Sequence, residues 1–266
     1  SLRGYRWMGP LIRLALSGVR RVAAQSEADA ARFRVLAGDG ARIEVTGNLK
    51  FDQPLPKASL DEAVGWRKAG GGRPTWVAAS THADEEAAVL EAHQRLRESH
   101  PDALLLWAPR HPERFDAVAN RVRAAGLDLR RRSVERSPDA RCAVFLIDSL
   151  GELPGFLAAG DVAFVGGSLC DIGGHNLLEP AALGVPVLSG PHTFNFAEIT
   201  ALLKDVGALE IVADAAQLAA AIQWLVDHPE KARARGRAGR QRIDRERGAL
   251  QRTLAVIDDA AGFPRP

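Results

Sequence analysis

Residues 166–180 concentrate small, polar and acidic side chains in the order GGSLCDIGGHNLLEP. Glycines allow a backbone to approach a ligand closely and to adopt positive φ angles. The segment runs into a helix-like stretch, and exposed amides at the start of that helix, near Asn176, would bind an anion such as phosphate. Glu179 lies in the first turn, where it either offsets the helix dipole or grips two sugar hydroxyls. Pro180 is tolerated only in a first turn, which supports this helix start.

More residues of this kind follow the strand-like segments of the chain. In an open parallel sheet, ligands bind beyond the carboxyl ends of the strands. The residues expected to line such a crevice are Ser80, Thr81, His82, Pro109, Arg110, His111, Asp148, Ser149, Gly151, Glu152, Gly166, Gly167 and Ser168. Serine, aspartate and glycine also end strands for purely structural reasons. The whole set therefore predicts a binding site better than any one member does.

The elements that must position these residues alternate along the chain. Apolar, strand-sized segments are predicted at 19–26, 43–49, 75–80, 103–109, 143–149, 162–168, 185–190 and 208–212. Helix-like segments are predicted at 84–99, 112–126 and 215–229, where apolar residues recur at helical spacing. Alternation of strands and helices, with strands that are continuously apolar, favours an α/β fold with a mostly parallel sheet covered on both faces.

The pattern also suggests where domains begin and end. Residues 53–74 carry prolines around a short charged helix and then three glycines, a composition typical of a linker. We expect one Rossmann-like domain at 75–245 and a helix or tail at 246–266. Residues 1–52 supply a helix, a strand, a helix and a strand, which is too little for a doubly wound domain. They resemble the end of an N-terminal domain.

Composition and missing motifs exclude several function classes. The 266 residues carry a formal net charge of +2, which does not call for nucleic acid, and Cys142 and Cys170 form no paired framework. The sequence contains no P-loop, no dinucleotide GxGxxG and no GxSxG elbow. No two histidines have the HxxxH spacing of a metal pair, so we expect no bound metal. Apolar runs are strand-sized, and the start is too basic and interrupted for a signal peptide. The run Asp84, Glu85, Glu86 is interpreted as a solvated first helical turn.

Five motifs in order resemble the C-terminal half of the bacterial 3-deoxy-D-manno-octulosonic acid (Kdo) transferases. They are VTGNLKFD at 45–52, STHADEE at 80–86, APRHPERF at 108–115, IDSLGEL at 147–153, and the long segment at 164–196. The resemblance implies a GT-B glycosyltransferase whose Rossmann-like C-terminal domain binds the donor, with only the end of the N-terminal domain in this chain. The implied reaction moves Kdo from CMP-Kdo onto a lipid A precursor in lipopolysaccharide core biosynthesis.

The resemblance also assigns roles to residues. The CMP-binding motifs correspond to Pro109 and Arg110, to Gly151, Glu152 and Leu153, and to Asn176, Leu177, Leu178 and Glu179. Together with the crevice, the predicted CMP and Kdo site adds Ser80, Thr81, His111, Gly167, Ser168, Gly173, Gly174 and His175. Lys50 matches a lysine that stabilises the transition state, where a cation could neutralise charge as CMP leaves. The family's general base is a glutamate of the N-terminal domain, and we expect it to lie outside this chain.

The implied setting is the cytoplasmic face of the bacterial inner membrane, with a membrane segment expected upstream. The partners would be CMP-Kdo, a lipid A precursor and an anionic membrane surface, with no cofactor and no nucleic acid. Basic residues interleaved with apolar ones at 1–21 suit an interfacial helix, and a second basic stretch lies at 227–252. The alternatives are a GT-B enzyme that uses a UDP-sugar and a non-catalytic nucleotide-sugar-binding module.

Overall fold

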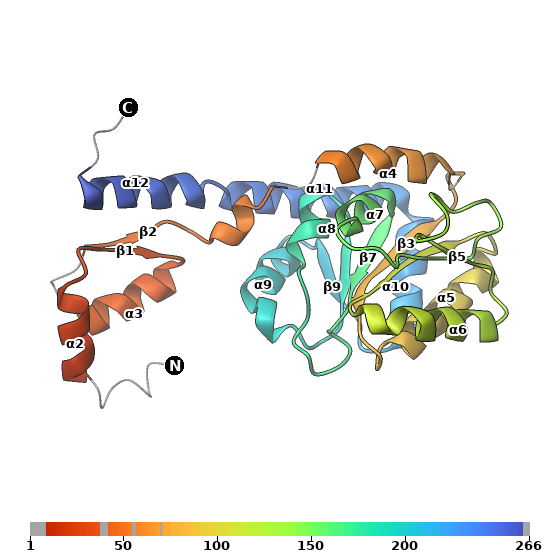
Figure 1. Cartoon of the computed structure of the whole chain (residues 1–266), viewed down its shortest axis with the longest axis horizontal. Helices are drawn as coiled ribbons and strands as arrows, with labels where there is room; N and C mark the ends of the chain where they lie inside the picture. The colour runs from red at the N-terminus through yellow and green to blue at the C-terminus, as the bar shows by residue number, and fades with distance from the viewer. Residues whose placement is uncertain (1–8, 38–41, 55–56, 70, 263–266) are drawn as a thin grey trace. The chain divides into compact units, whose positions relative to one another are not determined.

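The computed structural model describes residues 9–37, 42–54, 57–69 and 71–262 (Figure 1). The chain divides into two compact units. Unit 1 comprises Ser1–Pro54 and Asp244–Pro266, and unit 2 comprises Leu55–Ile243. Among the described residues, no helix is both long enough and apolar enough for a membrane span.

Unit 1 contains the helix, strand, helix and strand expected from the sequence, and it also contains the end of the chain. Its elements are α2 (Gly9–Ser17), β1 (Arg21–Ala24), α3 (Glu27–Ala37), β2 (Arg42–Val45), η3 (Leu49–Asp52) and α12 (Ala249–Ala261). Strands β1 and β2 pair in parallel. Asp52 accepts the backbone N–H groups of Gly248 and Leu250, each at 2.6 Å, and Arg252 donates from Nε to the Thr46 carbonyl at 2.7 Å. These bonds tie α12 to the first 54 residues, where we had expected a separate tail.

Unit 2 is built on a seven-stranded parallel sheet in the order β5-β6-β4-β3-β7-β8-β9. The strands are β3 (Thr75–Thr81), β4 (Leu104–Pro109), β5 (Leu129–Arg131), β6 (Val144–Leu146), β7 (Val162–Val165), β8 (Val187–Ser189) and β9 (Leu209–Ile211). The chain starts at β3, adds strands on one side through β4, and then returns to place β7 on the other side of β3. The carboxyl ends of β3 and β7 therefore form the topological switch point, where such sheets bind ligands.

Helices cover both faces of this sheet, as the continuously apolar strands predicted (Figure 1). Along β3, Trp76 and Ala78 belong to one hydrophobic core, and Val77 and Ala79 belong to the other. The first core includes residues of α5 (Glu86–Ser99), α6 (Phe115–Ala124) and α10 (Ala215–Asp227). The second includes residues of α4 (Lys57–Ala69) and α7 (Leu153–Ala159). The remaining elements are η4 (Pro112–Arg114), α8 (Leu178–Ala182), η5 (Phe194–Phe196), α9 (Ala197–Asp205) and α11 (Pro229–Glu246).

Two features of unit 2 differ from the sequence prediction. Most of the segment expected to be a linker, 53–74, belongs to unit 2, because α4 packs on α7 and the Trp66 ring stacks on Phe156 with centroids 3.8 Å apart. Strand β5 was not predicted. Its sequence is Leu-Arg-Arg, and both arginines form ion pairs, Arg130 with Asp128 and Arg131 with Asp148. A short edge strand with charged side chains carries no apolar signal.

Candidate functional site

The site is built at the switch point, where the ends of β3 and β7 approach closely. Gly166 donates its N–H to the Ala79 carbonyl at 2.8 Å, and a Cβ on Gly166 would lie 2.7 Å from the Thr81 Cα. Ser80 has a φ of +55° at a register shift in β3. A non-glycine residue in this region stores backbone strain, and such strain is concentrated at functional sites. The ends of β3 and β7 thus meet closely, with backbone strain at Ser80, at the edge of the sheet where the sequence predicts the site.

Three imidazoles gather at this edge of the sheet. The Nε2 atoms of His82 and His175 lie 2.8 Å apart, and the His82 and His111 rings meet edge to face with centroids 5.1 Å apart. Burial, with His82 and Arg110 nearby, lowers the pKa of His175 to about 4, and burial also lowers the pKa of His82. At neutral pH one ring of the pair therefore donates its N–H to the other. His82 follows β3 in the sequence, although it is not among the residues that the resemblance assigns.

Arg110 and His111 follow β4, and both are exposed. The Arg110 N–H donates to the Thr81 carbonyl at 2.9 Å, which fixes the backbone of Arg110 beside the end of β3. Within the described residues, the Arg110 guanidinium makes no ion pair. An exposed guanidinium at this edge of the sheet can offer two parallel N–H donors to a phosphate or carboxylate.

Asn176 and Glu179 form a small hydrogen-bonded group at the start of α8. Asn176 accepts the Leu178 N–H at 3.0 Å through Oδ1 and donates from Nδ2 to Glu179 Oε1 at 3.1 Å. Burial raises the pKa of Glu179, although the bond from Asn176 opposes this shift. The Leu178 amide, expected to be exposed for an anion, is thus capped by Asn176. Glu179 keeps acceptor capacity for hydroxyl groups.

The loop that contains Gly151, Glu152 and Leu153 leads from β6 into α7. Arg132 donates from Nε and Nη2 to Glu152 Oε1, at 3.1 and 2.6 Å, and the Ser149 hydroxyl donates to Oε2. In this structure both oxygens of the Glu152 carboxylate therefore accept hydrogen bonds from side chains of the protein. Its partner Arg132 directly follows the unpredicted strand β5.

Several residues of the predicted site are buried and make structural hydrogen bonds. The Thr81 hydroxyl accepts the Trp107 Nε1–H at 2.9 Å, and the Ser168 hydroxyl donates to the Val165 carbonyl at 2.7 Å and accepts the Gly190 N–H at 2.8 Å. The buried members of the predicted set are Thr81, Pro109, Gly167, Ser168, Gly173, Gly174, Leu177 and Leu178. The more accessible members are Ser80, Arg110, His111, Gly151, Glu152, Leu153, His175, Asn176 and Glu179.

The acidic run at the start of α5 corrects a sequence interpretation. Glu85 and Glu86 are fully buried instead of solvated. Glu86 forms a bidentate pair with Arg114, at 2.9 and 2.6 Å. Glu85 accepts backbone N–H groups from the glycine-rich turn after β7, including that of Gly167 at 2.6 Å. A charge run is normally a solvated face, and only the tertiary structure reveals these buried partners.

Lys50 lies in η3 of unit 1, where it is exposed and its N–H donates to Asn48 Oδ1 at 3.0 Å. Since it belongs to the other unit, its role as a transition-state stabiliser stays a prediction. Among the described residues, no group of three or more histidine, cysteine, aspartate or glutamate side chains could hold a metal ion.

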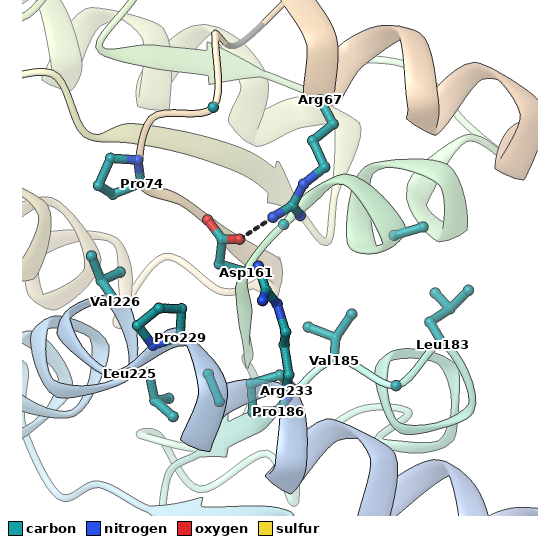
Figure 2. A pocket seen from close by; sticks show the side chains of 15 residues that line it. Arg67, Pro74, Asp161, Leu183, Val185, Pro186, Leu225, Val226, Pro229 and Arg233 are labelled. Carbon is teal, nitrogen blue, oxygen red and sulfur yellow. Dashed lines mark hydrogen bonds and ion pairs between the residues drawn. The ribbon is translucent and has the colours of Figure 1, made fainter.

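A cavity of about 570 Å³ opens elsewhere in unit 2 (Figure 2). Pro74, Asp161 and Pro186 line it, and each directly precedes a strand of the sheet. Figure 2 shows Arg67 reaching Asp161 across it. The cavity therefore lies at the amino ends of the strands and contains no predicted site residue. We do not assign the donor to it.

Comparisons with known proteins bear on the fold and the family of the chain. Residues 73–242 match the family model described as glycosyl transferases group 1, and residues 1–53 match the one described as 3-deoxy-D-manno-octulosonic-acid transferase (kdotransferase). The crystal structure of the C-terminal CMP-Kdo binding domain of WaaA from Acinetobacter baumannii superimposes with a TM-score of 0.60 and 37% identity, over 74% of this chain and 100% of that chain. A trehalose 6-phosphate synthase from Burkholderia multivorans, at 17% identity and a TM-score of 0.53 over 92% of this chain and 60% of that chain, shares the fold alone.

Unit 2 is thus the Rossmann-like domain of a GT-B type glycosyltransferase of group 1. Within that class, the chain belongs to the 3-deoxy-D-manno-octulosonic acid transferase family. It is 42% identical to the transferase of Bordetella pertussis, over 98% of this chain, and 39% identical to that of Haemophilus influenzae, over 91% of this chain. The chain spans 61% and 57% of the lengths of these two relatives.

Proposed function

We propose that this chain is the donor-binding part of a glycosyltransferase that moves Kdo from CMP-Kdo onto a lipid A precursor in lipopolysaccharide biosynthesis. The observation that carries the proposal is the match to a CMP-Kdo binding domain, at 37% identity over the whole of that domain. The accessible residues Arg110, His175 and Glu179, which follow β4 and β7 at the carboxyl edge of the sheet, support it.

The chemistry of these side chains suits the parts of the donor. Arg110 would receive the phosphate or the Kdo carboxylate through its guanidinium. Glu179, oriented by Asn176 at 3.1 Å, would accept hydroxyl groups of the ribose. Lys50 would neutralise the charge that develops as CMP leaves. The proposed reaction requires no cofactor beyond the donor.

The acceptor implies a location. Lipid A precursors lie in a bilayer, so we propose that the protein works at the cytoplasmic face of the inner membrane and contacts an anionic lipid surface. Basic residues at 1–21, interleaved with aromatic and aliphatic ones, would supply this contact.

Nucleotide selectivity tests the proposal directly. Thermal unfolding of the 266-residue chain should shift upward with CMP more than with UMP, by the equivalent of about 2.7 kcal/mol at a ligand concentration a hundredfold above Kd. Glu179→Ala should remove the shift and leave the fold intact. Glu98→Ala, which changes an exposed glutamate of α5, is the matched control and should keep it. Equal shifts with UMP and CMP would count against CMP-Kdo as the donor, a larger shift with UMP would favour a UDP-sugar enzyme, and no shift with either nucleotide would refute donor binding.

A further inference from the structure

The glycine-rich turn that follows β7 is already occupied by a carboxylate of the protein itself. Glu85 Oε2 accepts the N–H groups of Gly167 at 2.6 Å and His82 at 3.0 Å. Glu85 Oε1 accepts those of Ser168 at 2.9 Å and Leu169 at 2.8 Å. The side chain is fully buried. Successive backbone N–H groups of this kind form a concave anion site, and here an internal anion fills it.

The fit is specific to a carboxylate at this position. A carboxylate only accepts hydrogen bonds and has about four lone-pair sites, which match the four donors. Glutamine would direct an NH2 group at some of those donors and leave them unpaired. The space is also limited, because a Cβ on Gly166 would lie 2.7 Å from Glu85 Oε2 and 2.8 Å from the Ser80 carbonyl oxygen. Glycine at position 166 therefore leaves the room that the Glu85 carboxylate occupies.

The hydrogen bonds of Glu85 also reach the more accessible His82 and, through it, His175. Its bond to the His82 backbone fixes the residue whose Nε2 lies 2.8 Å from His175 Nε2. The turn that it holds also carries Gly167, whose carbonyl accepts the Gly174 N–H at 2.7 Å, next to His175 in the sequence. A Cβ on Gly167 would lie 2.8 Å from the His175 ring. His175 of the imidazole pair thus packs against the turn whose amides Glu85 binds.

We propose that Glu85 is a positioning residue, an internal anion that closes the amide nest of residues 167–169 and sets the His82–His175 pair for the donor. It follows that the negative charge of the donor is received by side chains such as Arg110 and not by these amides. The part of this inference that concerns the donor rests on the proposed function. The part that concerns the turn and the imidazoles does not.

Hydrogen exchange of the wild-type chain, measured by NMR without nucleotide, provides the first test. With Glu85 as their partner, the amides of Gly167, Ser168 and Leu169 should exchange at least about a hundredfold more slowly than in an unstructured chain. Adding CMP should change them little. Fast exchange without nucleotide, followed by protection on adding CMP, would show that the donor occupies the nest and would overturn the proposal.

A pair of adjacent buried glutamates provides the second test. Glu85→Gln should speed exchange of the three amides, shift the imidazole resonances of His175, and weaken CMP binding by about tenfold. Glu86→Gln, which breaks the ion pair to Arg114, should lower the melting temperature and leave these three readouts as in the wild type. Identical behaviour of the two variants in exchange and in the His175 resonances would refute a positioning role.

Further variants keep the test decisive if Glu85→Gln fails to fold. Glu85→Asp retains the charge and shortens the side chain by one methylene, and Glu86→Asp is its control. Faster exchange at residues 167–169 in the first variant alone would support the proposal, and equal exchange in both would contradict it. If the wild type does not bind CMP, the proposed function fails, while the exchange and imidazole measurements still decide the role of Glu85.

Discussion

His93 of α5 lies between two fixed partners in the core of unit 2. The Trp76 Nε1–H donates to its Nδ1 at 3.1 Å, so its Nε2 carries the proton and donates to the Ala143 carbonyl at 3.0 Å. Burial, with the charges of Arg97 and Arg73, lowers the pKa of His93 to about 3, although the bond to Ala143 opposes this shift. A second proton would face the Trp76 donor. The environment of His93 thus fixes both the tautomer of its ring and its neutral state.

This environment predicts a loss of stability in acid. Between about pH 6.5, the pKa of an unfolded histidine, and the lowered pKa of about 3, the unfolded state binds a proton that the folded state excludes. His93 should therefore lower the free energy of unfolding by about 1.4 kcal/mol for each pH unit below about 6.5. Urea unfolding of the wild type and of His93→Gln, measured at several pH values, would check this.

The variant should be less stable than the wild type at neutral pH and should show a flatter pH dependence. Part of the slope will remain, because His175 is also held neutral by burial. A variant whose slope equals that of the wild type would show that His93 does not carry the effect.

At the scale of one element, the packing of helix α11 against the rest of unit 2 requires small residues at the contact. A Cβ on Gly236 would lie 1.8 Å from the Gly184 carbonyl oxygen, which is backbone and cannot move aside as a side chain would. By contrast, a Cβ on Gly65 of α4 would meet nothing within 4 Å. Both glycines lie inside helices, but only one of them is required by packing.

Alanine substitutions at these two glycines should have opposite effects. Gly236→Ala forces the helix away from Gly184 and should destabilise unit 2 by about 1–3 kcal/mol or more. Gly65→Ala relieves the entropic cost of an exposed helical glycine and should stabilise by up to about 1 kcal/mol. Thermal unfolding of both variants and the wild type would check the signs. A neutral Gly236→Ala would mean that the contact with Gly184 is not tightly packed.

Elements were predictable from sequence where burial alone determines them. The eight apolar segments predicted as strands became β1–β4 and β6–β9. The clearest are β3, β4, β6, β7 and β8, because strands buried on both faces need continuous apolar residues. Strand β5 was not predicted because its arginines pair with acids that are distant in the sequence, such as Asp148, 17 residues after Arg131. The burial of Glu85 was not predicted for the same reason, since its partners on the turn begin 82 residues away at Gly167. Charged side chains reveal their role only when tertiary contacts bring partners to them.

At the scale of the whole chain, two basic stretches, 1–21 and 227–252, are candidates for binding an anionic membrane. In unit 2, Arg235 of α11 pairs with Glu210 at 2.7 Å and lies over the Trp224 ring at 4.6 Å, and Arg233 pairs with Glu230 at 2.7 Å. These charges are already partly neutralised. In unit 1, Leu11 and Leu14 of α2 are 59% and 71% exposed. Arg3 and Arg6, which are part of the predicted membrane-binding stretch, lie outside the described residues.

The pairing of Arg233 and Arg235 with glutamates favours residues 1–21 over residues 227–252 as the stretch that binds an anionic membrane. Each basic residue near such a surface contributes about 1 kcal/mol to binding. Arg3→Gln, Arg6→Gln and Arg13→Gln together should therefore lower the affinity for anionic vesicles, measured by sedimentation, by about a hundredfold. The same change at Arg233, Arg235 and Arg237 is the matched control and should have a smaller effect, because two of these side chains already pair with glutamates. Raising the salt from about 0.1 M to about 1 M shortens the Debye length from about 10 Å to about 3 Å and should release the wild type. Binding that ignores both salt and lipid charge, or that survives the first triple substitution unchanged, would rule out this electrostatic contact.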